Sequence, residues 1–156
     1  MKIIFLDIDG VLVTPASLYN IPNKKLIDVF CRTRVCRLNK IVQETNAKIV
    51  LSSSWRIGNT LDVMDTYLIH NGLQYTLYDK TPSFGQRSEE ITHWIKNNQP
   101  IVSYVILEDD VTDTMEEEHS GHIVKTKWWP TKEGAKDYGL LSEHVSKAIN
   151  ILNTKN

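Results

Sequence analysis

The chain has 156 residues, of which 41% are hydrophobic and 24% are charged. These values are ordinary for a folded globular protein, so we expect one domain over residues 1–156 and exclude a disordered or fibrous chain. The formal net charge of −1 excludes the overall basic field that favours nonspecific nucleic-acid binding, although it leaves room for a local basic patch.

Short apolar runs alternate with helical patterns along the chain. We expect strands, in chain order, at residues 2–6, 48–51, 75–78, 102–107 and 122–124, and helices within residues 34–46, 59–72, 87–99 and 142–152. The runs are mostly β-branched and do not alternate with polar residues, which is typical of parallel strands covered on both faces. This order predicts an α/β fold: a Rossmann-like, doubly wound, mainly parallel sheet with helices on both faces.

The first apolar run is interrupted by two aspartates too early for a signal peptide or a membrane span. We therefore expect a cytoplasmic protein that does not contact a membrane, and we expect a monomer or a weak dimer. The acidic stretch EEEH at residues 116–119 is expected to be a solvated loop.

Two carboxylates follow the first predicted strand, in the stretch FLDIDGVL at residues 5–12. Asp7 and Asp9 are two positions apart, so in an extended strand both side chains point to the same face. Like charges that are held close repel each other, and the pKa of one should rise unless a cation lies between them. This motif therefore predicts a metal ion, a shared proton, or both.

Polar residues also follow two other predicted strands. They are Ser52, Ser53 and Ser54 after KIVL, and Glu108, Asp109, Asp110 and then Asp113 after VIL. Ligands of a doubly wound sheet bind outside the carboxyl ends of its strands. Carboxylates from two strands form a hard-oxygen site suited to Mg²⁺, which is commonly held together with a substrate phosphate. The Ser52 hydroxyl and a cation such as Arg87 are candidates to hold the remaining phosphate oxygens.

These motifs resemble those of the haloacid dehalogenase-like (HAD) phosphohydrolase superfamily. FLDIDGVL is similar to its first motif, IVLSSSW to its second and VILEDDVTD to a variant of its fourth. The third motif is a Lys or Arg near the start of the preceding helix; we place it at Arg87, with Lys80 as the rival. The order of LSSSWR, the RSEEITHWI helix and YVIL further resembles small HAD domains associated with nucleic-acid repair.

The resemblance implies a Rossmann-like core and an aspartyl-phosphate mechanism. Asp7 would be the nucleophile, and Asp9 would protonate the leaving oxygen and then activate water. Ser52 would bind the transferring phosphoryl group and Arg87 would stabilise its charge. The other expected substrate-binding residues are Gly10, Ser53, Arg56 and Lys80.

The resemblance also implies a Mg²⁺ site. Its ligands would be the side chains of Asp7 and Asp109 and the backbone carbonyl of Asp9. Asp113 takes the place of the second acid of the fourth motif, and Glu108 and Asp110 stay open as alternatives.

Neither gap between the motifs is long enough for a separate cap domain. About 40 residues separate Asp9 from Ser52 and about 35 separate Ser52 from Arg87, and elements of the core occupy part of them. We therefore expect an open site, which favours a phosphate on a large substrate such as a nucleic-acid end or a phosphoprotein. The alternative functions are a small-molecule nucleotidase or sugar phosphatase, or a non-catalytic domain that binds phosphorylated ends.

Trp55, Arg56 and the stretch KTKWWP at residues 125–130 are expected on the same face as the site. Aromatic rings with interleaved cations are typical of surfaces that stack nucleic-acid bases. The other interpretation is that Trp128 and Trp129 cover the sheet edge or pack on the last helix, and the usual burial of Trp favours it.

Overall fold

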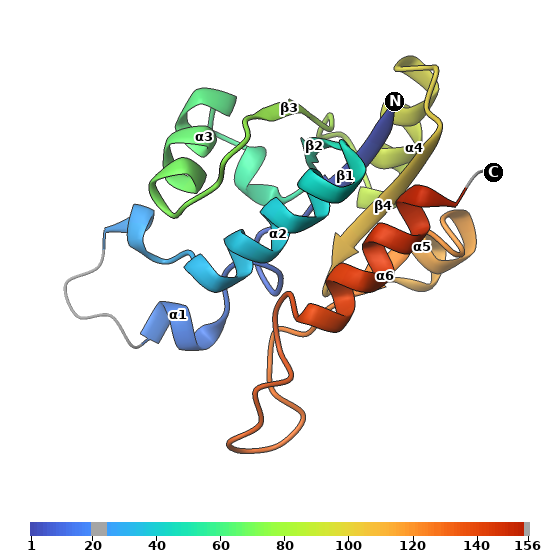
Figure 1. The fold of residues 1–156 in the computed structure, drawn as a ribbon. Helices are drawn as coiled ribbons and strands as arrows, with labels where there is room; N and C mark the ends of the chain where they lie inside the picture. Colours follow the sequence, from blue (N-terminus) through green and yellow to red (C-terminus); the bar gives the residue numbers. More distant parts are fainter. Residues whose placement is uncertain (20–24, 155–156) are drawn as a thin grey trace.

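A five-stranded parallel sheet forms the centre of the protein in the computed structural model, which describes residues 1–19 and 25–154 (Figure 1). Its strands are β1 (Lys2–Leu6), β2 (Lys48–Leu51), β3 (Leu77–Lys80), β4 (Ser103–Glu108) and β5 (Ile123–Lys125). The spatial order is β3-β2-β1-β4-β5, and every neighbouring pair is parallel. The chain thus winds outward from β1 in both directions, which confirms the predicted doubly wound α/β fold.

Helices connect the strands. They are α1 (Pro15–Tyr19), α2 (Arg32–Thr45), α3 (Leu61–His70), α4 (Arg87–Asn97), α5 (Asp113–Glu118) and α6 (Ser142–Asn153), with short 3-10 turns at Leu26–Asp28 and Ser54–Arg56. The four predicted helices are present as α2, α3, α4 and α6. Thr60 caps α3, because its hydroxyl accepts a hydrogen bond from the Val63 N–H at 3.3 Å. None of the described helices is long and apolar enough to cross a membrane.

Alternate side chains of β1 enter two separate hydrophobic cores. Ile4 and Leu6 pack in a core with α2, α3 and α6, whereas Ile3 and Phe5 pack in a second core with α4 and α5. Figure 1 shows α2 and α6 side by side over the first face. In the second core the rings of Phe5 and Trp94 meet edge to face, with centroids 5.5 Å apart. Both faces of β1 are covered, which is why its sequence is a continuous apolar run.

The strand register decides which residues meet at the carboxyl edge of the sheet. Leu6 of β1 lies opposite Leu107 of β4, so Asp7 and Glu108, which follow directly, reach the same edge. The Asp7 N–H continues the ladder by donating to Leu107 O at 3.0 Å. On the other side of β1, the Ser52 N–H donates to Leu6 O at 3.0 Å. The polar residues after three strands are therefore brought to one edge.

The strand β3 begins two residues later than the prediction of 75–78. Tyr75 packs against the first core instead of joining the sheet. The Leu77 N–H donates to Asp65 Oδ1 of α3 at 2.7 Å, and this contact determines where the chain enters β3.

The acidic stretch 116–119 is not the solvated loop that its composition indicates. Most of it belongs to α5, which begins after Thr112. The Thr112 hydroxyl caps the helix by accepting a hydrogen bond from the Met115 N–H at 3.2 Å. Met115 is buried in the second core and His119 is only 2% exposed. One apolar anchor in an acidic run gives no helical periodicity, so this helix depends on the Thr112 cap and on the packing of Met115.

Candidate active site

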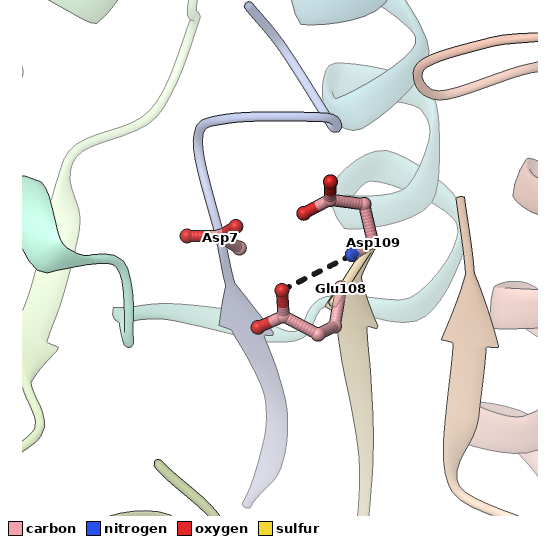
Figure 2. Close-up of side chains that lie close together, drawn as sticks. All are labelled: Asp7, Glu108 and Asp109. Atoms are coloured by element: carbon pink, nitrogen blue, oxygen red, sulfur yellow. Dashed lines mark hydrogen bonds between the residues drawn. The ribbon is translucent and has the colours of Figure 1, made fainter. Parts of the chain in front are cut away.

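Three carboxylates meet at the carboxyl edge of the sheet, between β1 and β4 (Figure 2). Asp7 follows β1, Glu108 is the last residue of β4, and Asp109 comes next. Each offers one oxygen, and these oxygens all lie within 4.8 Å of one another. Asp7 is 3% exposed and Glu108 is fully buried, so water screens their charges poorly. Oxygen donors of this kind are the ligands that Mg²⁺ prefers.

The crowding of these acids changes their pKa values. Burial, followed by the charge of Asp7, raises the pKa of Glu108 to about 8 and the pKa of Asp109 to about 6. The backbone N–H groups of Asp109 and Asp110 both donate to Glu108 Oε1 at 3.1 Å and orient its carboxylate; Figure 2 marks the bond from Asp109. Crowding therefore disfavours the fully ionised form of the cluster, and a divalent cation that binds there would compete with protons for its oxygens.

Arg87 is the cation that faces the acids. It is the first residue of α4, and its Nη1 lies 3.2 Å from Asp7 Oδ1 and donates to Glu108 Oε2. Burial lowers the pKa of Arg87, but the charges of Asp7 and Glu108 outweigh burial and raise the pKa overall. Lys80, the rival, donates instead to two backbone carbonyls at 3.2 and 3.0 Å. Of the two cations, the geometry favours Arg87.

Asp9 reaches the same cavity from the loop after β1. Its Oδ2 accepts a hydrogen bond from the indole Nε1 of Trp55 at 2.9 Å. Burial raises the pKa of Asp9, whereas the bond from Trp55 lowers it. The Trp55 ring is held in turn by an edge contact with Phe30, with centroids 5.3 Å apart. Trp55 thus lies on the face of the site, as expected, where its indole orients a carboxylate.

Gly10 lets the loop after β1 approach the acids closely. Its φ of 70° lies in the left-handed region, and a Cβ on this residue would clash with the Asp109 side chain. The Gly10 carbonyl accepts a hydrogen bond from Thr126 Oγ1 at 2.7 Å, which ties the loop to the segment after β5. A larger residue at this position would therefore displace a carboxylate of the cluster.

The three serines after β2 have different environments. Ser52 is fully buried, and its hydroxyl has no hydrogen-bond partner among the described residues. Ser53 is also buried, and its hydroxyl accepts from the Trp55 N–H at 3.4 Å. Ser54, to which no role was assigned, is the serine that lines the cavity beside Asp7. Ser52 and Ser53, which were expected to bind the phosphoryl group and the substrate, are not among the residues that line this cavity.

Arg56 does not reach this site, which corrects the prediction that it binds substrate. Its guanidinium donates at 2.8 Å to the carbonyls of both Ser52 and Ser53, and also to the carbonyl of Pro82 at 2.9 Å. It forms an ion pair with Glu90, and both side chains are buried. All of these partners are fixed in the protein, so Arg56 holds together the loop that follows β2.

A cavity of about 710 Å³ opens beside the three acids. The predicted residues that line it are Asp7, Asp9, Arg87, Asp109 and Asp113, together with the two alternatives Glu108 and Asp110. Asp113 does not join the three clustered oxygens, because it is the first residue of α5. Within the described residues, Glu108 and Asp109 are therefore the acids whose oxygens cluster with an oxygen of Asp7.

Ser88 is a further cavity residue that sequence reasoning missed. It follows Arg87 at the start of α4, and its buried hydroxyl has no partner among the residues described. No local pattern distinguishes it from an ordinary helical serine. Ser54 had a signal, because it belongs to the same SSSW stretch as the serines that were predicted.

One protein-family description matches most of the chain. The HAD domain in Swiss Army Knife RNA repair proteins matches over residues 3–131, a range that contains every residue of the cavity. Searches of curated proteins and of solved structures give no match.

Proposed function

Because the chain belongs to the family of the HAD domain in Swiss Army Knife RNA repair proteins, we propose that it is a Mg²⁺-dependent phosphomonoester hydrolase that acts on nucleic-acid ends. Family membership by itself supports phosphoesterase-type activity. The observation that carries the finer proposal is the cluster of Asp7, Glu108 and Asp109, which shares one cavity with Asp9 and Arg87.

The donor set fits Mg²⁺. Asp7, Glu108 and Asp109 offer carboxylate oxygens close together at a sheet edge, and burial and mutual repulsion raise the pKa values of the last two, which a bound cation would reverse. These side chains would hold the ion, with the Asp9 carbonyl as a further ligand. The ion would neutralise charge on the transferring phosphoryl group.

Asp7 begins the reaction as a nucleophile. One of its carboxylate oxygens forms a bond to phosphorus while the bond between phosphorus and the leaving oxygen breaks. Asp9, whose pKa is raised by burial, gives its proton to the leaving oxygen, so the alcohol departs neutral. Arg87, 3.2 Å from Asp7 Oδ1, is placed to balance the charge on the phosphoryl oxygens.

Asp9 then acts as a base. It takes a proton from water as the water oxygen bonds to phosphorus, and the bond between phosphorus and Asp7 breaks. Inorganic phosphate leaves, and both aspartates return to their starting states. Trp55 holds Asp9 Oδ2 at 2.9 Å, which assigns the proton transfer to the other carboxylate oxygen.

Two observations support a large substrate. Between Asp9 and Ser52, the helices and strands of the described residues are the short α1, a 3-10 turn, the core helix α2 and the core strand β2. The family is named for RNA repair, in which phosphorylated strand ends are the chemically relevant groups. We therefore favour a polynucleotide end over a phosphoprotein or a sugar phosphate.

The test is phosphate release with Mg²⁺ from a matched panel. The panel holds one RNA sequence with a 3′-phosphate or a 5′-phosphate, the corresponding mononucleotide, a phosphopeptide and a sugar phosphate. We expect release from one or both RNA ends, and we expect EDTA or Asp7→Asn to reduce it to background. Asp62→Asn changes an exposed acid on α3 and serves as the matched control with wild-type activity.

Two results would contradict the proposal. Release from the mononucleotide or the sugar phosphate alone would identify a small-molecule phosphatase. A non-catalytic binding domain would release no phosphate from any substrate, and both the wild type and Asp7→Asn would bind phosphorylated RNA tightly.

A further inference from the structure

The segment between β5 and α6 carries a second, aromatic cavity. This segment, residues 126–141, projects in orange from the edge toward which the arrow of β4 points (Figure 1). A cavity of about 410 Å³, which we call the Trp129 cavity, lies between this segment and the start of α1. Its walls include Pro15, Trp129, Pro130, Lys136 and Tyr138. This volume is within the range of small-ligand sites.

The segment is held in shape by its own polar contacts. Asp137 accepts hydrogen bonds from the Thr131 N–H at 3.1 Å, from the Thr131 hydroxyl at 2.6 Å and from Lys127 Nζ at 3.0 Å. Arg34 of α2 lies over the Tyr138 ring, 5.2 Å from its centroid, and donates to the Tyr138 carbonyl at 3.3 Å. These contacts hold the Tyr138 side of the cavity in place without a ligand.

The Trp129 cavity is tied to the loop that carries the candidate catalytic residues. At one end of the segment Thr126 Oγ1 donates to Gly10 O at 2.7 Å, and at the other end the Leu140 N–H donates to Val11 O at 2.9 Å. Pro15, which lines the cavity, begins α1 shortly after these residues. A ligand in the Trp129 cavity therefore contacts a segment whose two ends are hydrogen-bonded to the loop that follows Asp9.

The two tryptophans of this segment have different environments. Trp128 packs against the first core, as the burial interpretation expected. Trp129 is 60% exposed, which is unusual for the largest apolar side chain. Its ring is held against Trp128 by an edge contact with centroids 6.2 Å apart. The Trp129 ring therefore contacts Trp128 on one side and leaves an exposed surface on which a ligand can stack.

The charge of the segment complements a polyanion. Residues 126–141 contain three Lys and two acids, which gives a net charge of +1 where the whole chain has −1. Flat aromatic walls with cations beside them stack bases and track the phosphate backbone of a single strand. An acidic phosphopeptide would use the lysines but would leave the stacking walls unused.

We propose that the Trp129 cavity binds the nucleobase next to the phosphorylated end of a single-stranded RNA. This assignment rests on the proposed phosphatase function and adds the part of the substrate that the protein recognises. Trp129 and Tyr138 stack on the base, Lys136 pairs with a backbone phosphate, and the terminal phosphate extends to Asp7.

The test is a two-by-two comparison of protein and substrate. Wild type and Trp129→Ala are each measured on an RNA oligonucleotide with the active phosphate end and on the same strand with an abasic terminal nucleotide. We expect Trp129→Ala to lower kcat/KM about tenfold more on the normal strand than on the abasic strand, mainly through KM. Trp129→Phe should restore most of the loss, because it retains a ring.

The controls separate this inference from the proposed function. Tyr78→Ala removes another exposed aromatic side chain, on β3 at the opposite edge of the sheet, and should behave as wild type. The base-binding assignment is overturned if Trp129→Ala lowers kcat/KM equally on the normal and the abasic strand. It is also overturned if the variant lowers phosphopeptide hydrolysis as much as RNA hydrolysis. In both cases the proposed phosphatase activity stands. If the wild type releases no phosphate, the proposed function fails. Fluorescence titration of the wild type with the same two strands then tests base binding in the Trp129 cavity by itself. A tenfold higher affinity for the normal strand supports base binding, and equal affinity overturns it.

Discussion

Two arginine–glutamate pairs in this protein differ in the exposure of the arginine and in the direction in which its pKa is shifted. Arg56 and Glu90 are both buried, with side chains 5% and 4% exposed, and backbone carbonyls take the remaining donors of Arg56. Arg87 pairs with the fully buried Glu108 but is itself 25% exposed at the cavity and also contacts Asp7. Burial lowers the pKa of Arg56, whereas the acids around Arg87 outweigh burial and raise its pKa.

The difference shows what makes a charged pair structural and what makes it available for chemistry. Every partner of Arg56 is a fixed atom of the protein, so nothing can replace those contacts without unfolding the loop. Arg87 contacts more than one carboxylate. A metal ion can replace it as the partner of these acids, and Arg87 can then pair with a phosphoryl group.

The largest expected effect is on the structural pair. Arg56→Ala should lower the free energy of unfolding by about 3–5 kcal/mol, because it leaves Glu90 charged and buried without its partner. Urea unfolding measures the loss, and Arg87→Ala should lose clearly less. If the two variants are equally stable, Arg56 is not the structural residue of the two.

Arg87→Ala should mainly affect catalysis. We expect kcat to fall about 10²–10³-fold, because a charge that balances the transferring phosphoryl group is lost. Arg87→Lys should recover part of the rate. A change in KM alone, with kcat retained, would assign Arg87 to substrate binding.

Glu108 should make stability depend on pH when no divalent metal is added. Its pKa is raised from 4.5 to about 8, so between these values the native state binds more protons than the unfolded state. The free energy of unfolding from this residue should therefore fall as pH rises from 5 to 8, by at most about 1.4 kcal/mol per pH unit. Lowered pKa values of His119 and His144 act in the opposite direction.

The difference between wild type and Glu108→Gln isolates this contribution. Urea unfolding at pH 5, 6, 7 and 8 in EDTA should show a weaker loss of stability with pH in the variant. Added Mg²⁺ should stabilise the wild type more at pH 8 than at pH 5, because the metal competes with protons. Equal profiles for the two proteins would contradict the raised pKa.

The smallest expected effect is at Trp55. Trp55→Phe removes the indole donor to Asp9 and should lower kcat about two- to tenfold, the value of one hydrogen bond. It should also shift the acid limb of the pH–rate profile upward, because the bond from Trp55 lowers the pKa of Asp9. A loss of rate without that shift would indicate a structural role only.

The sequence was sufficient for much of the fold and part of the site. β1 and the acids after it were predictable because apolar runs and strand periodicity are local properties. Asp7, Asp9, Asp109 and Arg87 do line one cavity. Arg56 was assigned to substrate because LSSSWR places it after a strand end, and nothing local shows that its partners lie near Pro82 and Glu90.

Residue types and their periodicity determined by themselves that this protein has an α/β sheet with acids at its strand ends. Only the tertiary structure decided that Glu108 and Asp109, not Asp113, close on Asp7, because strand register and the start of α5 set those distances. The tertiary structure also turned Trp55 toward Asp9 and left Trp129 exposed. The physical reason is that secondary structure depends on neighbours along the chain, whereas a site depends on which distant side chains compete for the same space and charge.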